Sequence, residues 1–91
     1  MREVILDGTT MQTMPECLEQ IFNGLAGLIP DPGGRNLDAL HEDLLELSEP
    51  VVIRWVNSDA ARQELFSMFD RTVDMLRSQS NRDNPITLFL E

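Results

Sequence analysis

Three short runs of apolar residues lie near the start, in the middle and at the end of the chain, and the segments between them have helical periodicity. The runs are residues 4–6, 51–56 and 86–90, and we expect each of them to form a strand. The middle run shows little alternation, which is typical of a strand buried on both faces. Because helical crossovers join parallel strands, the pattern predicts a small parallel sheet covered by helices, with right-handed connections.

The segment after the first run has the features of a helix that begins at about Met14. Thr13 and Glu16 have the spacing of a capping box, and apolar residues then recur at helical spacing. These apolar residues are Met14, Leu18, Ile21, Phe22 and Leu25. Pro30 stops this helix, and residues 29–34, which contain two prolines and two glycines, are expected to form an exposed loop.

A second helix is expected to begin after Asn36, a favourable N-cap residue, and to end at Pro50. One face has leucines at alternating three- and four-residue spacing, namely Leu37, Leu40, Leu44 and Leu47. On the opposite side, four carboxylates project within an arc of roughly 80°. These are Asp38, Glu42, Glu46 and Glu49. The pattern therefore predicts a helix that buries its leucines and exposes a row of acids.

The segment between the second and third runs is helix-like over residues 60–80, with Asn57 and Ser58 as cap candidates. Its apolar stripe consists of Leu65, Phe66, Phe69, Val73 and Leu76. One bent helix and two short helices fit this pattern equally well. Residues 81–85 are rich in turn formers and are expected to connect this segment to the last strand.

The length and charge of the chain limit the classes of partner. With 91 residues there is room for a single domain, residues 1–91, with one modest core. Sixteen Asp and Glu residues against seven Lys and Arg residues give a net charge of -9, so we expect no binding to nucleic acid. The same field would attract a basic protein and speed its association. Acidity that serves only solubility is the alternative, and charge alone does not separate the two.

The only cysteine, Cys17, excludes an intramolecular disulfide, and no apolar export segment follows Met1. No apolar run approaches the roughly 18 to 20 residues that a membrane span requires. We therefore expect a soluble, cytoplasmic protein that does not bind membranes. Cys17 lies within the first predicted helix without a cation nearby in sequence, which indicates a structural thiol rather than a reactive one.

The residues needed for catalysis are scarce. Nucleophilic catalysis requires a nucleophile, a base and an orienting group, and the chain has one histidine, His41, and one cysteine. Asp38 and Glu42 resemble an acid and base pair or two ligands of a hard cation, but either site needs further oxygen donors from another element. The two glycines before Arg35 lack the lysine and third glycine of a phosphate loop. We expect no enzymatic activity, no metal and no cofactor.

The acidic row on the second predicted helix has two interpretations. It presents negative charge at about the spacing of a nucleic-acid backbone, so it would mimic RNA toward a protein that binds RNA. It is equally compatible with the solvated face of an ordinary amphipathic helix. The spacing alone leaves both open.

Residues 34–40, with the sequence GRNLDAL, resemble the signature of the barstar family of ribonuclease inhibitors. Three further segments occur in the same order as in that family and at nearly the same separations. They are the apolar run followed by Asp7 and Gly8, the predicted strand with Trp55, and the closing predicted strand at Ile86. The resemblance covers nearly the whole chain. It implies an α/β fold, with a single layer of three parallel strands packed by about four helices.

The resemblance also implies a function. A member of this family is an inhibitor, or an immunity protein, that blocks the active site of a basic ribonuclease or nuclease toxin with its second helix and the loop before it. We expect it to be a monomer when unbound. The runner-up is a barstar-fold adaptor that binds another basic protein without inhibiting a nuclease.

By position in the family, Gly34 would let the loop backbone approach the enzyme, and Asn36 and Asp38 would hydrogen-bond to it. Glu42 stands where the family's key aspartate occupies the phosphate site. His41 and Glu46 complete the predicted contact residues, on the same acidic helix.

The chain also departs from the best-known member of the family. Pro32 replaces an aromatic loop residue, His41 replaces a tryptophan, Ser78 stands where the last helix has a glutamate, and Glu42 is one methylene longer than aspartate. Because buried aromatic anchors carry much of the affinity of an interface, we expect a barnase-type enzyme to bind poorly.

Overall fold

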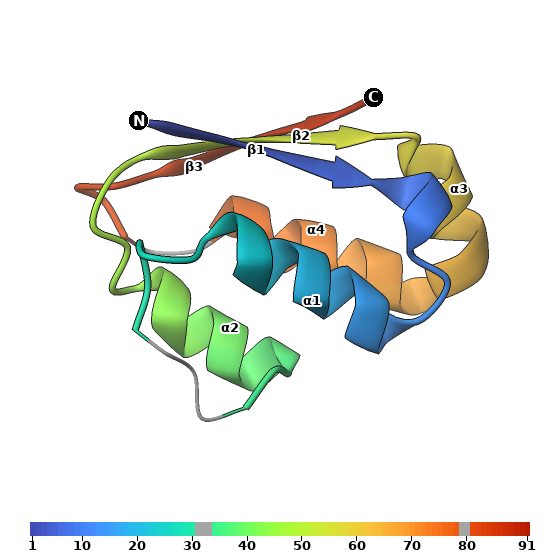
Figure 1. Ribbon diagram of the computed structural model, residues 1–91, viewed down its shortest axis with the longest axis horizontal. Coiled ribbons are helices and arrows are strands. Elements are labelled where there is room, and N and C mark those ends of the chain that lie inside the picture. Colours follow the sequence, from blue (N-terminus) through green and yellow to red (C-terminus); the bar gives the residue numbers. More distant parts are fainter. Residues whose placement is uncertain (31–33, 79–80) are drawn as a thin grey trace.

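Three parallel strands form one sheet in the order β1-β2-β3 (Figure 1). The computed structural model describes residues 1–30, 34–78 and 81–91. Strand β1 covers Arg2–Asp7, β2 covers Val51–Val56 and β3 covers Ile86–Leu90. Each predicted strand is confirmed, and the first is longer than its apolar run because it extends to a charged residue at both ends.

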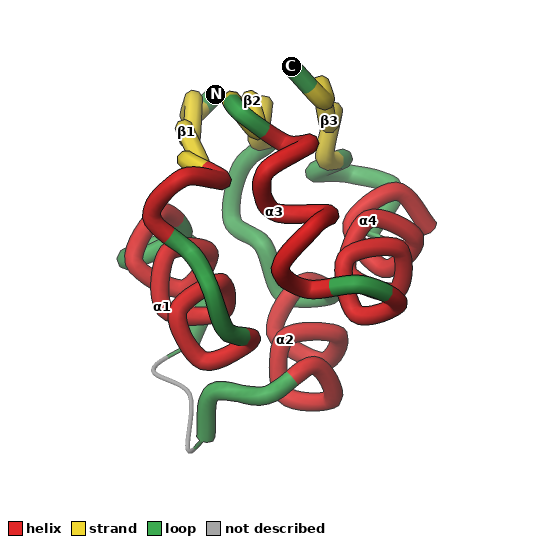
Figure 2. Tube along the Cα trace, turned by 90° about the vertical axis from the view of Figure 1, so that its right-hand side faces the viewer, coloured by secondary structure: helices red, strands yellow, loops and turns green. Residues whose placement is uncertain are grey.

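The helices all lie on one side of the sheet and form two layers. They are α1 (Met14–Gly24), α2 (Leu37–Leu44), α3 (Ser58–Leu65) and α4 (Ser67–Ser78), with a short 3₁₀ helix η1 (Gly8–Thr10) after β1. Helices α1 and α4 lie directly beneath the sheet, and α2 lies on their far side (Figure 2). The three-stranded parallel α/β architecture with four α-helices, counted over the described residues, confirms the predicted fold class.

The core fills the space between the sheet and the helices. Aligned inward residues of the three strands, Val4, Ile53 and Leu88, are buried against the apolar faces of the helices. Trp55 is fully buried, and its ring centroid lies 4.9 Å from that of Phe69. Cys17 is also buried, and desolvation raises the pKa of its thiol to about 12. At neutral pH this thiol therefore stays protonated and unreactive.

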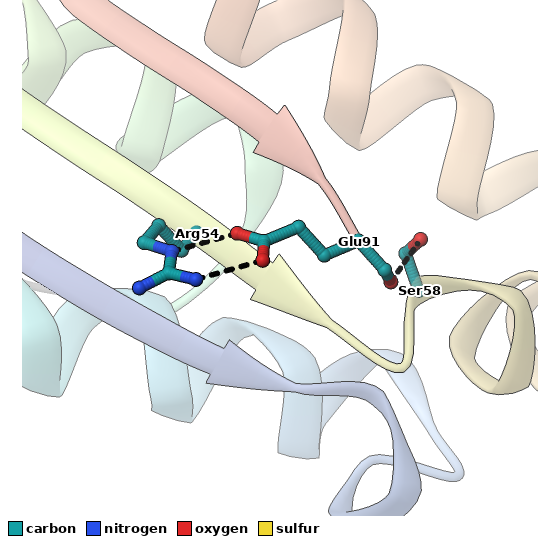
Figure 3. A network of polar contacts seen from close by, with 3 residues as sticks. All are labelled: Arg54, Ser58 and Glu91. Carbon is teal, nitrogen blue, oxygen red and sulfur yellow. Dashed lines mark hydrogen bonds and ion pairs between the residues drawn. The ribbon is translucent and has the colours of Figure 1, made fainter.

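The prediction that β2 is buried on both faces is wrong. The helices cover one face only, and Arg54 in the middle of β2 is exposed on the other. Its guanidinium forms two hydrogen bonds, of 2.7 and 2.8 Å, with the carboxylate of Glu91 (Figure 3). Ile5 and Phe89, the register partners of Arg54, are 59% and 51% exposed. A nearly continuous apolar run thus belongs here to a strand with one open face.

The predicted segment 60–80, whose last two residues lie outside the described residues, contains two helices rather than one, and the break falls at Phe66. This residue has a φ of 52° and is 75% exposed, so its assignment to the apolar stripe is wrong. The other members of the stripe are buried. The reason is geometric: a residue that reverses the chain between two helices lies outside the periodicity of both. Asn57, at the N-cap of α3, makes no side-chain capping bond; its side chain donates to Asp7 instead.

Candidate functional site

The N-terminal end of α2 is fixed by a side-chain cap. Oδ1 of Asn36 accepts a hydrogen bond of 2.8 Å from the backbone N–H of Ala39, as the sequence predicts for an N-cap asparagine. Leu40 and Leu44 are fully buried, and Leu37 is partly buried against the same core. The buried side holds the helix in place and directs its other side to solvent.

The second helix ends at Leu44, earlier than the predicted end at Pro50. The next three backbone N–H groups donate to carbonyls three residues earlier. This is the hydrogen-bond pattern of a 3₁₀ turn, which is tighter than the α-helix and ends it here. The side-chain amide of Asn81 donates to the carbonyls of Leu44, Leu45 and Leu47, and that of Asn84 donates to Leu47 at 2.7 Å. These bonds satisfy carbonyls that a continuing helix would have used.

The early end of α2 divides the predicted row of four carboxylates. Asp38 and Glu42 remain on the helix, whereas Glu46 and Glu49 follow it, so the prediction that all four share one helical row is wrong. Glu49 forms an ion pair of 3.0 Å with the N-terminal ammonium group. Glu46 is exposed in the turn after the helix.

The exposed face of α2 carries three of the predicted contact residues. Asp38, His41 and Glu42 are all exposed, and their spacings of three and four residues place them on one side of the helix. Asp38 lies in the first turn, where the positive end of the helix dipole favours a carboxylate. Within the described parts of the chain, no cation forms an ion pair with Asp38, Glu42 or Glu46.

Asp43 is a further member of this acidic region that the sequence analysis did not single out. Burial raises the pKa of its carboxyl group above the ordinary value, and repulsion from Glu46 and then Glu42 raises it further. Its Oδ2 atom is buried and has no hydrogen-bond partner among the described residues. The signal was present in the sequence, because Asp43 lies between two other acids and next to the buried Leu44. We name Asp38, Glu42, Asp43 and Glu46 the α2 acidic cluster.

The loop before α2 is described only in part. Gly34 and Asn36 are exposed, and Pro32 lies outside the described residues. Among the described residues, a β-carbon added to Gly34 would meet only the Asn36 side-chain nitrogen, at 3.5 Å, an ordinary contact distance. No contact with the described residues therefore requires glycine at position 34. Ser78 is exposed at the end of α4, and its hydroxyl donates to the carbonyl of Asp74.

The described residues offer little for other chemistry. Among them, no group of three or more His, Cys, Asp or Glu side chains is arranged to hold a metal ion. Searched over the same residues, no helix has both the length and the apolar character needed to cross a membrane. The exposed side chains of α2, among them Asp38, His41 and Glu42, can offer charge and hydrogen-bonding groups to a partner.

The family described as Barstar (barnase inhibitor) matches residues 1–91, which is the whole chain. No curated protein matches the chain at a significant level.

Proposed function

The chain belongs to the barstar family, and from this membership we propose that it inhibits a basic ribonuclease by covering the active site with α2 and residues 34–36. Members of the family are inhibitors, and this function needs only a surface that fits the enzyme. The proposal also states that the partner is basic and that the predicted contact residues bind it. It further states that the chain acts in the cytoplasm as a monomeric immunity protein without enzymatic activity.

The observation that carries the proposal is the uncompensated α2 acidic cluster. The ion pairs among the described residues use Glu49, Glu91 and Asp70, and none uses a member of the cluster. The raised pKa of Asp43 reflects, in part, the negative potential of its neighbours. A basic active site that closes over α2 would supply the missing positive charge, and this gain is available only in the complex.

Glu42 is the main anchor of the proposed interface. It is exposed on α2, and the resemblance to the family implies that its carboxylate occupies the enzyme's phosphate site. Asp38 and His41 flank it on the same side of the helix, and Glu46 extends the acidic surface past the helix end. A carboxylate that replaces a phosphate must meet Arg, Lys or His side chains, so loss of Glu42 would leave those cations buried and unpaired.

Gly34 and Asn36 bring the loop backbone close to the enzyme. Because the described residues leave space for a β-carbon at Gly34, we expect a defect caused by Gly34→Ala to arise in the complex and not in folding. Asn36 uses Oδ1 for the cap, and its Nδ2 donates to no atom of the described residues, so this N–H group remains available to the partner.

The proposal is tested by titrating the purified chain against barnase and against ribonucleases encoded in the same genome, with a fluorogenic RNA as substrate. We expect complete, 1:1 inhibition of one enzyme and no RNA cleavage by the chain alone. Barnase itself should be inhibited weakly, because His41 and Pro32 replace aromatic anchors. RNA cleavage by the chain would contradict the proposal. Failure to inhibit any of the enzymes, together with stable binding to a basic protein that is not a nuclease, would support an adaptor instead.

A further inference from the structure

A cavity of about 380 Å³ opens between the end of α1 and the residues that precede α2. Its apolar lining comes from Phe22 on α1 and from Ala26, Ile29 and Pro30 beyond it. This volume is at the lower end of the range, roughly 300–1,000 Å³, of cavities that hold small ligands. It therefore has room for a side chain from another molecule.

Among the described residues, Arg35 is the charged residue that lines this cavity. The centre of its guanidinium group lies 5.9 Å from the centroid of the Phe22 ring, within the range of a cation–π contact. In a chain with sixteen acidic residues, no carboxylate of the described residues forms an ion pair with Arg35. The guanidinium is thus placed by an aromatic ring, and its N–H groups donate to no atom of the described residues, so they can serve a further partner.

The cavity is continuous with the proposed inhibitory surface. Arg35 stands between Gly34 and Asn36, both of which are expected to contact the enzyme. An enzyme that covers residues 34–36 and α2 would come close to the cavity mouth. Among its described residues, the surface then presents two opposite signs of charge, with carboxylates along α2 and the guanidinium of Arg35 beside the loop.

We propose that this cavity receives an acidic side chain of the partner ribonuclease, whose carboxylate pairs with Arg35. The inference rests on the proposed function and adds a specificity contact to it. The apolar walls would contact the methylene groups of a Glu or Asp side chain, and a guanidinium pairs with a carboxylate through two parallel hydrogen bonds. Enzymes that are basic throughout this region would leave Arg35 facing a like charge, which discriminates against them.

This inference makes a prediction opposite in sign to simple charge attraction. If the chain binds only through its net negative charge, Arg35→Glu makes the net charge more negative by about two units and strengthens binding to a basic enzyme. If Arg35 pairs with a carboxylate, the same change places two acids against each other and weakens binding. The matched control is Arg71→Glu on α4, which changes the net charge equally at an exposed residue without an ion pair among the described residues.

The experiment measures the dissociation constants of the unmutated chain, Arg35→Glu and Arg71→Glu with the ribonuclease that the inhibition assay identifies, at about 0.1 M salt. We expect Arg35→Glu to weaken binding about 10- to 100-fold and Arg71→Glu to leave binding unchanged or slightly stronger. Substituting the facing acidic residue of the enzyme with Arg should restore binding to Arg35→Glu. Thermal unfolding confirms that both variants fold.

The outcomes separate the two proposals. If the unmutated chain inhibits no ribonuclease, the proposed function fails. If the unmutated chain inhibits the enzyme and Arg35→Glu binds as well as Arg71→Glu, the proposed function stands and the role of the cavity is overturned. The role of the cavity is also overturned if Arg35→Glu weakens binding but no single charge reversal of an acidic residue on the enzyme restores it. The weakening would then have another origin.

Discussion

The side chain of Asn36 caps α2 by accepting a hydrogen bond from the backbone N–H of Ala39. The same residue is a predicted contact with the enzyme, so its structural role must be separated from its binding role. Asn36→Ala removes the cap and should lower the free energy of unfolding by about 1 kcal/mol. Asn36→Asp keeps an accepting oxygen and should leave stability nearly unchanged, but it removes the Nδ2 donor. Urea unfolding monitored by the fluorescence of Trp55, the only tryptophan, measures both changes.

Binding assays on the same two variants complete this test. If Asn36 contacts the enzyme through Nδ2, Asn36→Asp weakens inhibition at unchanged stability. Equal inhibition by Asn36→Asp and the unmutated chain would show that the asparagine acts only as a cap.

The exposed carboxylates of α2 should matter for binding and little for folding. Asp38→Ala and Glu42→Ala should each abolish tight inhibition of the cognate enzyme, because each leaves enzyme cations buried without a partner. The temperature of half-unfolding should change little, since neither carboxylate has an ion pair among the described residues. Asp38→Ala also loses a favourable interaction with the helix dipole, about 0.3–1 kcal/mol. Calorimetric titration and thermal unfolding measure the two effects.

A suitable control for these variants is Glu64→Ala, which removes an exposed carboxylate from α3, outside the proposed interface. It should retain inhibition. Unfolding of either α2 variant under conditions where Glu64→Ala is folded would contradict the assignment, because it would identify Asp38 or Glu42 as a structural residue.

The sequence predicts those features of this fold that depend on neighbouring residues. Apolar runs identify the three strands, and Asn36 identifies the start of α2, because periodicity and capping act within a few residues. The end of α2 was not predictable in this way. The side chain of Asn81 donates hydrogen bonds to carbonyls at that end. Asn81 is 34 residues beyond Leu47 in the sequence, and only the complete fold brings the two together.

The open face of the sheet shows the same limit. Val52 and Val56 belong to an apolar run, but whether a second layer covers them depends on where the chain places its helices. All the helices lie beneath the opposite face, which the order of elements alone does not determine. For the candidate site, the sequence identified exposed residues on α2, but the cavity beside Arg35 arises from two segments that meet only in the folded protein.

The backbone at Phe66 predicts a stabilising substitution. A φ of 52° is unfavourable for any residue with a β-carbon, and the ring gains little from burial because it is 75% exposed. Phe66→Gly should therefore raise the free energy of unfolding by about 1 kcal/mol, after the entropic cost of glycine is included. Phe66→Ala is the matched control, because it removes the ring but keeps the β-carbon, and it should give no such gain. Urea unfolding distinguishes them, and equal stability of the two variants would argue against backbone strain.

The net charge of -9 predicts how the association rate depends on salt. The field of the α2 acidic cluster extends about 10 Å at 0.1 M salt and about 3 Å at 1 M, so the association rate with a basic enzyme should fall steeply over this range. The dissociation rate should change less, because contacts within the closed interface are screened less. Stopped-flow fluorescence across a salt series measures both rates. An association rate that stays constant would mean that the acidic residues serve solubility and do not steer the partner.

Asp43 should respond to pH in a direction set by its raised pKa. The fold favours the protonated carboxyl group, because burial and the repulsion from Glu46 and Glu42 oppose its ionisation. The stabilising contribution of the protonated form is therefore present below the unfolded value, about 3.9, and is lost as pH rises through the higher folded value. At pH 7 the ionised carboxylate destabilises the native state, so Asp43→Asn should raise the temperature of half-unfolding.

This gain should shrink as the pH falls and disappear below the ordinary carboxyl pKa, where the unmutated chain is neutral at this position as well. Glu64→Gln on α3 controls for the loss of one negative charge from a chain of -9 and should give a smaller gain at pH 7. Thermal unfolding of the three proteins between pH 3.5 and pH 7 tests the prediction. A gain from Asp43→Asn that is constant over this range would show that the asparagine stabilises through a new hydrogen bond. A gain that follows the titration would show that the acidic cluster costs stability in the free protein, as expected if its charge is retained for a basic partner.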